Sequence, residues 1–238
     1  MMKYNSIFLT IIIFLFPVLT VTANPAFQVS ETTFNFGKTA QHVVINHTFW
    51  IKSIGKDTLR ITKIVPGCGC TQAPLSDSVL APGDSAALDI MLSTRSYRGY
   101  LSKRPYFLTN ASGEKQYLKI NANLLLKPEE SQPITVKPFR VDVSQFTKLV
   151  RRRAKFLIEN KSDHGFKIKL IDGSNKYFDI TLPDKINAGE TAEGMIKVHK
   201  NAVKKSFEQS FTFQINDDQQ SRFTVPVRRE YRMLIKDK

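Results

Sequence analysis

The sequence contains few of the residues that build conventional catalytic or metal sites: two cysteines, four histidines and one tryptophan among 238 residues. Both cysteines, Cys68 and Cys70, lie in one short segment, so they cannot form a disulfide framework that links distant parts of the chain. Two thiolates also fall short of the four ligands of a structural zinc site. No Ser, His and acid arrangement, phosphate-binding loop or pair of hydrolase-type carboxylates can be identified. We therefore expect neither a conventional enzyme active site nor a cofactor.

Long hydrophobic runs are also scarce. The only one extends from Ile7 to Val21, and it is short for a membrane-spanning helix and carries Pro17. Lys3 precedes this run, and Val21-Thr22-Ala23 offers a small-residue cleavage site. The pattern predicts a secretory signal peptide over residues 1–23, with a retained N-terminal anchor as the alternative. No later segment favours a transmembrane span, so we expect an exported protein, in the periplasm first and at the cell surface or secreted otherwise.

Acidic residues are outnumbered, 21 against 35 Lys and Arg, which gives a formal net charge of +14 at pH 7. The excess is uneven, at +4 over residues 24–130 and +9 over residues 131–238. In an exported protein this charge suits an envelope protein or an anionic surface polymer as partner, whereas nucleic acid is not expected. The alternative is that the Lys and Arg side chains only solvate the outer faces of strands and prevent edge pairing. Arg228-Arg229-Glu230-Tyr231-Arg232 is expected to do so on a last edge strand.

Short alternating segments indicate β structure. Apolar and polar residues alternate over residues 43–52, and similar segments follow at 59–61, 86–92, 106–109 and 117–125. Turn residues separate them, as in Pro82-Gly83-Asp84. Short strands about 8 to 12 residues apart are typical of a sandwich or barrel. Apolar residues at helical spacing are nowhere sustained, so the sequence predicts an all-β fold.

The second half of the chain repeats the first. Phe49 corresponds to Phe156, Pro82-Gly83 to Ala188-Gly189 and Asn110 to Asn216, at offsets of 107, 106 and 106 residues. Units of about a hundred residues have the size of immunoglobulin-like sandwiches. We therefore expect a signal peptide at 1–23, an immunoglobulin-like domain at 24–130 and a second, divergent one at 131–238. A single large barrel is the alternative, and the duplication argues against it.

Several short motifs carry a family resemblance. They are Phe34-Asn35-Phe36-Gly37, His47-Thr48-Phe49-Trp50-Ile51, Leu59-Arg60-Ile61, Gly67-Cys68-Gly69-Cys70-Thr71, Pro82-Gly83 and Thr109-Asn110. Together they resemble domain-of-unknown-function family 1573, which comprises exported bacterial proteins with an immunoglobulin-like domain, and the resemblance covers roughly residues 27–125. It implies a fold and a location but no activity. The chain departs from the family at Ser53, where Asn is usual, and the second half lacks the cysteine signature.

The cysteine segment allows three interpretations. Cys68 and Cys70 tend to pair in an oxidising compartment, and a bridge or the packing of two thiols would fix the turn structurally. Gly69 is expected to supply the backbone freedom that such a turn needs. Alternatively, the pair exchanges with substrate thiols. In a third interpretation, the two thiolates and His47 hold a soft metal ion, although His47 is in phase with Phe49 and is expected to face inward and be satisfied locally.

Two surface features are candidates for binding. Trp50 alternates with Phe49 and Ile51 and is therefore expected on the outer face of its strand, where it can anchor an interface or pack under a loop. Arg151, Arg152 and Arg153 can clamp phosphate or carboxylate groups or simply form a solvated turn. The leading hypothesis is a non-enzymatic exported interaction, scaffold or assembly module. Thiol redox or soft-metal binding through Cys68 and Cys70 is the alternative, and binding of an anionic glycan or polymer is the second.

Overall fold

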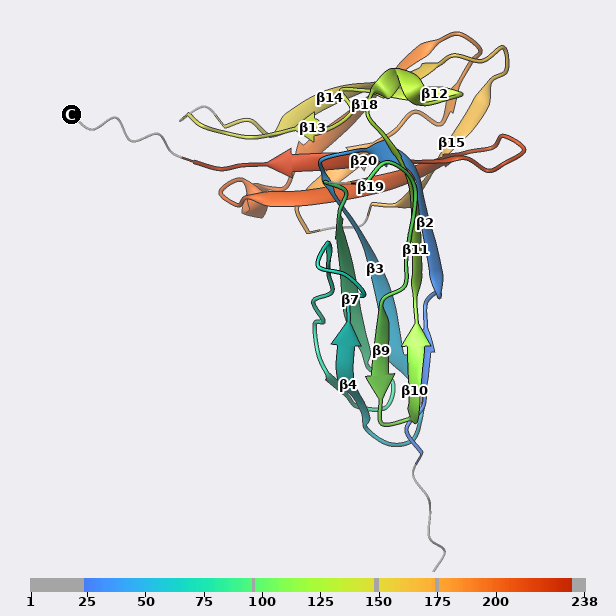
Figure 1. The fold of residues 1–238 in the computed structure, drawn as a ribbon. Coiled ribbons are helices and arrows are strands. Elements are labelled where there is room, and N and C mark those ends of the chain that lie inside the picture. The colour runs from blue at the N-terminus through green and yellow to red at the C-terminus, as the bar shows by residue number, and fades with distance from the viewer. Residues whose placement is uncertain (1–23, 96, 148–149, 174–175, 233–238) are drawn as a thin grey trace, which may run out of the picture.

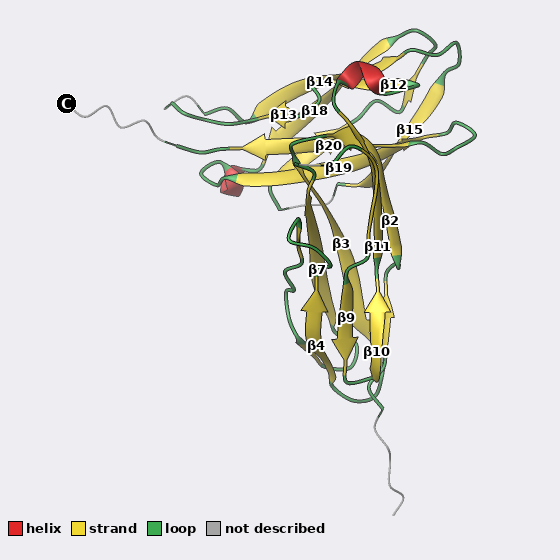
Figure 2. Cartoon of the chain, in the orientation of Figure 1, coloured by secondary structure: helices red, strands yellow, loops and turns green. Residues whose placement is uncertain are grey.

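The structure, a computed structural model, describes residues 24–95, 97–147, 150–173 and 176–232. These residues form β-strands joined by turns, with two short 3-10 helices at Pro128–Glu130 and Lys200–Ala202 (Figure 2). The all-β prediction is confirmed. None of the helices in the described part of the chain has the length and apolar character needed to cross a membrane. The predicted signal peptide, residues 1–23, lies outside the described residues.

The strands fall into an N-terminal half and a C-terminal half. The N-terminal half consists of β1 (Phe27–Val29), β2 (Thr33–Ala40), β3 (Val44–Ser53), β4 (Leu59–Val65), β5 (Thr71–Gln72), β6 (Val79–Leu80), β7 (Ser85–Ser93), β8 (Gly99–Lys103), β9 (Tyr106–Thr109), β10 (Ser112–Tyr117) and β11 (Lys119–Leu125). The C-terminal half consists of β12 (Ile134–Lys137), β13 (Val141–Asp142), β14 (Arg153–Asn160), β15 (Phe166–Asp172), β16 (Phe178–Thr181), β17 (Lys185–Ile186), β18 (Thr191–Val198), β19 (Phe207–Ile215) and β20 (Arg222–Arg229). Each half buries its own hydrophobic cluster, drawn from residues 34–124 and 134–227.

The sequence repeat is also a repeat of topology. The sheet order β1-β3-β7-β5 corresponds to β12-β14-β18-β16, and β10-β9-β4-β6 corresponds to β20-β19-β15-β17. Asn110 and Asn216 even make the same contact, because each side-chain oxygen accepts a backbone N–H, from Arg60 at 2.8 Å and from Lys167 at 2.6 Å. Equivalent asparagines thus tie equivalent strands, β4 and β15, to the turns that follow β9 and β19.

Ser53 lies where the second repeat has an asparagine, and the two side chains make different contacts. Its counterpart Asn160 donates from its amide to the carbonyls of His164 at 2.7 Å and Asn187 at 2.9 Å. The Ser53 hydroxyl is buried and has no hydrogen-bond partner among the described residues. The turn contact therefore survives in the C-terminal half and is lost from the N-terminal half.

The two halves share one large sheet. Its order is β17-β15-β19-β20-β2-β11-β8, and β2 meets β20 in parallel where Lys38 pairs with Phe223. In Figure 1 the strands of the N-terminal half, blue to green, run into those of the C-terminal half, yellow to red, which lie across their end. The position of β20 corrects the edge-strand prediction for Arg228–Arg232. It lies inside this sheet between β19 and β2, with β13 also paired to it.

The Phe34-Asn35-Phe36-Gly37 motif builds the junction between the halves. Gly37 has φ +67°, and a Cβ at this position would lie 2.0 Å from the carbonyl oxygen of Arg222. The Thr224 hydroxyl donates to the Phe36 carbonyl at 2.6 Å. On the neighbouring strand, the Ser210 N–H donates to the side-chain oxygen of Asn46 at 2.7 Å. Only a residue without a side chain lets β2 approach β20 so closely.

Candidate functional site

The cysteine turn lies between β4 and β5, and its two cysteines are joined as a Cys68–Cys70 disulfide. The Thr71 N–H donates to the Cys68 carbonyl at 3.2 Å, and the Ser93 N–H donates to the Cys70 carbonyl at 2.8 Å, so the turn is fastened to β7. The prediction for Gly69 is wrong. The residue of this segment with positive φ is Gly67, at +86°, which directly precedes the hydrogen-bonded turn from Cys68 to Thr71.

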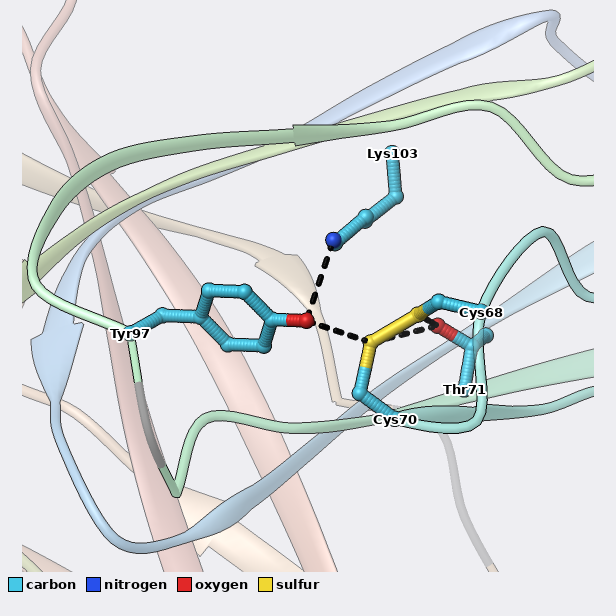
Figure 3. Close-up of a disulfide and its surroundings, with 5 residues drawn as sticks. All are labelled: Cys68, Cys70, Thr71, Tyr97 and Lys103. Carbon is cyan, nitrogen blue, oxygen red and sulfur yellow. Dashed lines mark hydrogen bonds between the residues drawn. A yellow bond between two sulfur atoms is a disulfide. The ribbon is translucent and has the colours of Figure 1, made fainter.

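The sulfur atoms lie among polar groups (Figure 3). The Tyr97 hydroxyl donates to Cys70 Sγ at 3.3 Å, and Lys103 Nζ donates to that hydroxyl at 3.2 Å. Lys103 Nζ also lies 4.4 Å from the centre of the Tyr97 ring. The Thr71 hydroxyl lies 3.2 Å from Cys68 Sγ and 3.7 Å from Cys70 Sγ. Tyr97 and Lys103 were not identified from the sequence, because nothing local marks a tyrosine 27 residues from Cys70 as its neighbour.

His47 faces inward as predicted, with 8% of its side chain exposed. Its ring stacks on Phe34 with centroids 3.6 Å apart. Its partners are not local: Nε2 lies 3.1 Å from Glu31 Oε1, and Nδ1 lies 2.5 Å from Asp172 Oδ2 in the other half. The metal set of Cys68, Cys70 and His47 is not assembled, since the described residues contain no metal-binding group of three His, Cys, Asp or Glu.

Trp50 is 52% exposed on β3, as the alternation predicts. Both of its backbone groups bond Ser30, the residue after β1: its N–H donates to the Ser30 hydroxyl at 3.1 Å, and its carbonyl accepts the Ser30 N–H at 2.9 Å. The indole therefore stands on a strand whose backbone is held from the β1 side. Its role as an interface anchor stays a prediction.

The three arginines line a basic hollow. We use this name for the depression of about 500 Å³ formed by Val150, Arg151, Arg152, Arg153 and Lys197. Arg153 at the start of β14 pairs directly with Lys197 on β18, and both are exposed. The sequence did not reveal Lys197, which lies 44 residues further along the chain. Sheet register thus adds a fourth positive charge to the predicted cluster.

The rest of this sheet face is neutralised by ion pairs. Lys137 bonds Glu159 at 3.0 Å, and Lys155 bonds Glu193 at 3.0 Å. The hydrogen bond from Lys137 also lowers the pKa of Glu159. Between described residues, no ion pair joins Arg153 or Lys197 to a carboxylate; Asp179, which faces Lys197, bonds His199 at 2.8 Å. On this sheet face, Arg153 and Lys197 at the basic hollow therefore differ from Lys137 and Lys155 in forming no salt bridge among the described residues.

Arg229 fixes the backbone of the hollow from inside. It is 1% exposed, and its guanidinium donates to the carbonyls of Arg151 at 2.9 Å, Val203 at 2.6 Å and Val143. It also donates to the side-chain oxygen of Gln145 at 2.9 Å. Burial lowers the pKa of Arg229, and Tyr231 partly opposes this effect. The loop that presents Arg151 and Arg152 is thereby pinned to β20.

Residues 27–124 match the model of a family described as "Protein of unknown function (DUF1573)". The N-terminal half belongs to this family. No curated protein sequence matches the chain. The DUF1573 half carries the cysteine turn and the Gly37 side of the junction, whereas the basic hollow lies in the other half.

Solved structures resemble the chain only weakly. A protein of unknown function from Porphyromonas gingivalis W83 is 13% identical, with a TM-score of 0.34, over 86% of this chain and 99% of that one. The YadV chaperone is 12% identical, with a TM-score of 0.30, over 85% and 98%. Domains 5–6 of the S-layer protein SbsC are 12% identical, with a TM-score of 0.25, over 87% and 98%. Likenesses at this level carry no argument about function.

Proposed function

We propose that the protein is an exported, non-enzymatic interaction module of the bacterial envelope, and that its basic hollow binds anionic groups of a partner. The observation that carries the proposal is the pairing of Arg153 with Lys197 in a hollow also lined by Arg151 and Arg152. The periplasm is the compartment we propose, on the strength of the signal-peptide pattern in residues 1–23.

The positive charges at the basic hollow are explained better by the binding of an anionic ligand than by a role in stabilising the fold. Like charges directly opposite one another destabilise a sheet, and neither side chain of this pair forms a salt bridge among the described residues, unlike Lys137 and Lys155 on the same face. Asp179 lies opposite Lys197, but its carboxylate bonds His199. A bound carboxylate or phosphate would relieve the repulsion. Arginine is suited to such groups because its planar guanidinium can make two parallel hydrogen bonds. Such a conflict with a local rule is expected at functional sites.

The proposal predicts that positive charge at the basic hollow contributes more to the affinity for anionic polymers than positive charge elsewhere on the protein. The double variant Arg153→Ala/Lys197→Ala is expected to weaken binding to polygalacturonate or polyphosphate at least about tenfold, which is about 1.4 kcal/mol. Binding should also weaken as salt rises, because these charges are exposed and screened. Isothermal titration at several salt concentrations measures both effects.

The matched control is Lys137→Ala/Lys155→Ala, which removes the same net charge from the same sheet. Their ammonium groups are already paired with Glu159 and Glu193, so binding should change less than about twofold. In thermal unfolding, the Arg153→Ala/Lys197→Ala variant should be at least as stable as the parent, because a like-charge pair is removed. The control variant should be the less stable of the two. Equal weakening in both double variants would leave only non-specific attraction and refute the proposed site.

A further inference from the structure

The cysteine turn points to a second activity that the proposed interaction role does not use. We propose that the Cys68–Cys70 disulfide is a thiol–disulfide exchange site, in which a partner dithiol attacks Cys68 and Cys70 departs as the thiolate. The structure distinguishes the two sulfur atoms, because the chain of hydrogen bonds from Lys103 through Tyr97 ends on Cys70 (Figure 3).

The hydrogen bonds favour negative charge on Cys70. The Tyr97 hydroxyl already points at Cys70 Sγ, and the Lys103 ammonium group donates to the oxygen of that hydroxyl. Hydrogen bonding to the charged form of a group stabilises that form, and a nearby cation favours a thiolate. A sulfur that leaves as a better-stabilised thiolate leaves faster. The Thr71 hydroxyl contacts both sulfur atoms, at 3.2 Å from Cys68 and 3.7 Å from Cys70. The cation-backed donor reaches Cys70 alone, so Cys70 is the leaving group.

Packing favours attack on the other sulfur. Cys70 packs against the hydrophobic cluster of the N-terminal half, which shields one side of its sulfur. Both cysteines are partly buried, but only Cys70 belongs to the residues packed against that cluster. A Cβ built on Gly69, the residue between the cysteines, would meet no atom within 4 Å. The turn is therefore open beside Gly69, and the packing against the cluster covers Cys70 rather than Cys68.

The exchange consumes one partner dithiol for each disulfide. The first partner thiolate forms a bond to Cys68 Sγ as the Cys68–Cys70 bond breaks. The electron pair of the broken S–S bond stays on Cys70, which later takes a proton from water. The second partner thiolate then attacks the partner sulfur in the mixed disulfide and releases Cys68 as a thiolate. The partner is oxidised by two electrons, and the cysteine pair is reduced by two.

The first test uses the oxidised full chain and dithiothreitol as the dithiol. Tyr97→Phe keeps the ring beside Lys103 and removes only the hydroxyl, and Lys103→Met removes the cation. Each is expected to slow the second-order rate of reduction at least fivefold at neutral pH. Tyr100→Phe is the matched control, because Tyr100 on β8 is 70% exposed, and it should stay within twofold of the parent. A Tyr97→Phe rate equal to that of the control would overturn the proposal.

A second measurement assigns the sulfur atoms. The single cysteine left by Cys68→Ser is Cys70, and its pH profile of alkylation by iodoacetamide should lie at least one pH unit below that of Cys68 in Cys70→Ser. Adding Tyr97→Phe to Cys68→Ser should move the profile upward, a shift that a purely structural role for the tyrosine does not produce. A more acidic Cys68 would contradict the assignment. The Arg153→Ala/Lys197→Ala variant should be reduced at the parent rate, so this activity and the proposed binding function can fail separately.

Discussion

Replacement of Gly37 by alanine is expected to lower the free energy of unfolding by about 3 kcal/mol or more. An alanine held at φ +67° costs roughly 1–2 kcal/mol by itself, because its Cβ crowds the following carbonyl. The larger contribution comes from the junction, where the new Cβ would lie 2.0 Å from the Arg222 carbonyl oxygen and 2.4 Å from its carbon. These are backbone atoms of a central strand, so relief requires β2 and β20 to separate.

Gly99 provides a close control for this prediction. Its φ is +68°, and a Cβ there would meet no atom within 4 Å. Gly99→Ala should therefore show the conformational cost alone, about 1–2 kcal/mol. Urea unfolding of both variants, followed by far-ultraviolet circular dichroism, gives the difference. If the two variants lost the same stability, the close approach of the halves at Gly37 would be wrong.

Replacement of Arg229 by methionine is expected to cost about 3 kcal/mol or more, because each buried acceptor left without a donor costs about 1–3 kcal/mol. The lost donors serve the carbonyls of Val143, Arg151 and Val203 and the side-chain oxygen of Gln145. Methionine fills much of the volume but donates nothing. Because the Arg151 carbonyl is one of the acceptors, the basic hollow should also lose its shape. Affinity for polygalacturonate should then fall together with stability.

A variant of the adjacent Arg228 is the control that distinguishes the loss of these buried hydrogen bonds from a general loss of positive charge. It bonds Glu230 at 2.8 Å, and 37% of its side chain is exposed. Arg228→Met removes the same charge from the same strand and should cost at most about 1 kcal/mol, as is usual for exposed ion pairs. Chemical denaturation of both variants measures the contrast. Similar losses would mean that Arg229 does not hold the loop as described.

The local chemistry of the sequence was enough to predict several strands of the N-terminal half. Alternation predicted the strand at Tyr106–Thr109 with its observed bounds and placed Trp50 outward. Strand alternation has a fixed period of two, so the exposed and buried faces follow directly from the order of residues. The repeat of Asn110 and Asn216 likewise marked equivalent turn contacts, because an asparagine side chain can bond a nearby backbone N–H.

By itself, then, the sequence determined the all-β class, the repeat, the pairing-competent cysteines and the arginine cluster, because each depends on residues close together in the chain. Tertiary structure decided the rest. It placed Tyr97 and Lys103 beside Cys70, Asp172 beside His47 and Lys197 opposite Arg153. It also buried Arg229, which the pattern had suggested for an exposed edge. Such contacts depend on sheet register and on how two halves pack, and no local period encodes either.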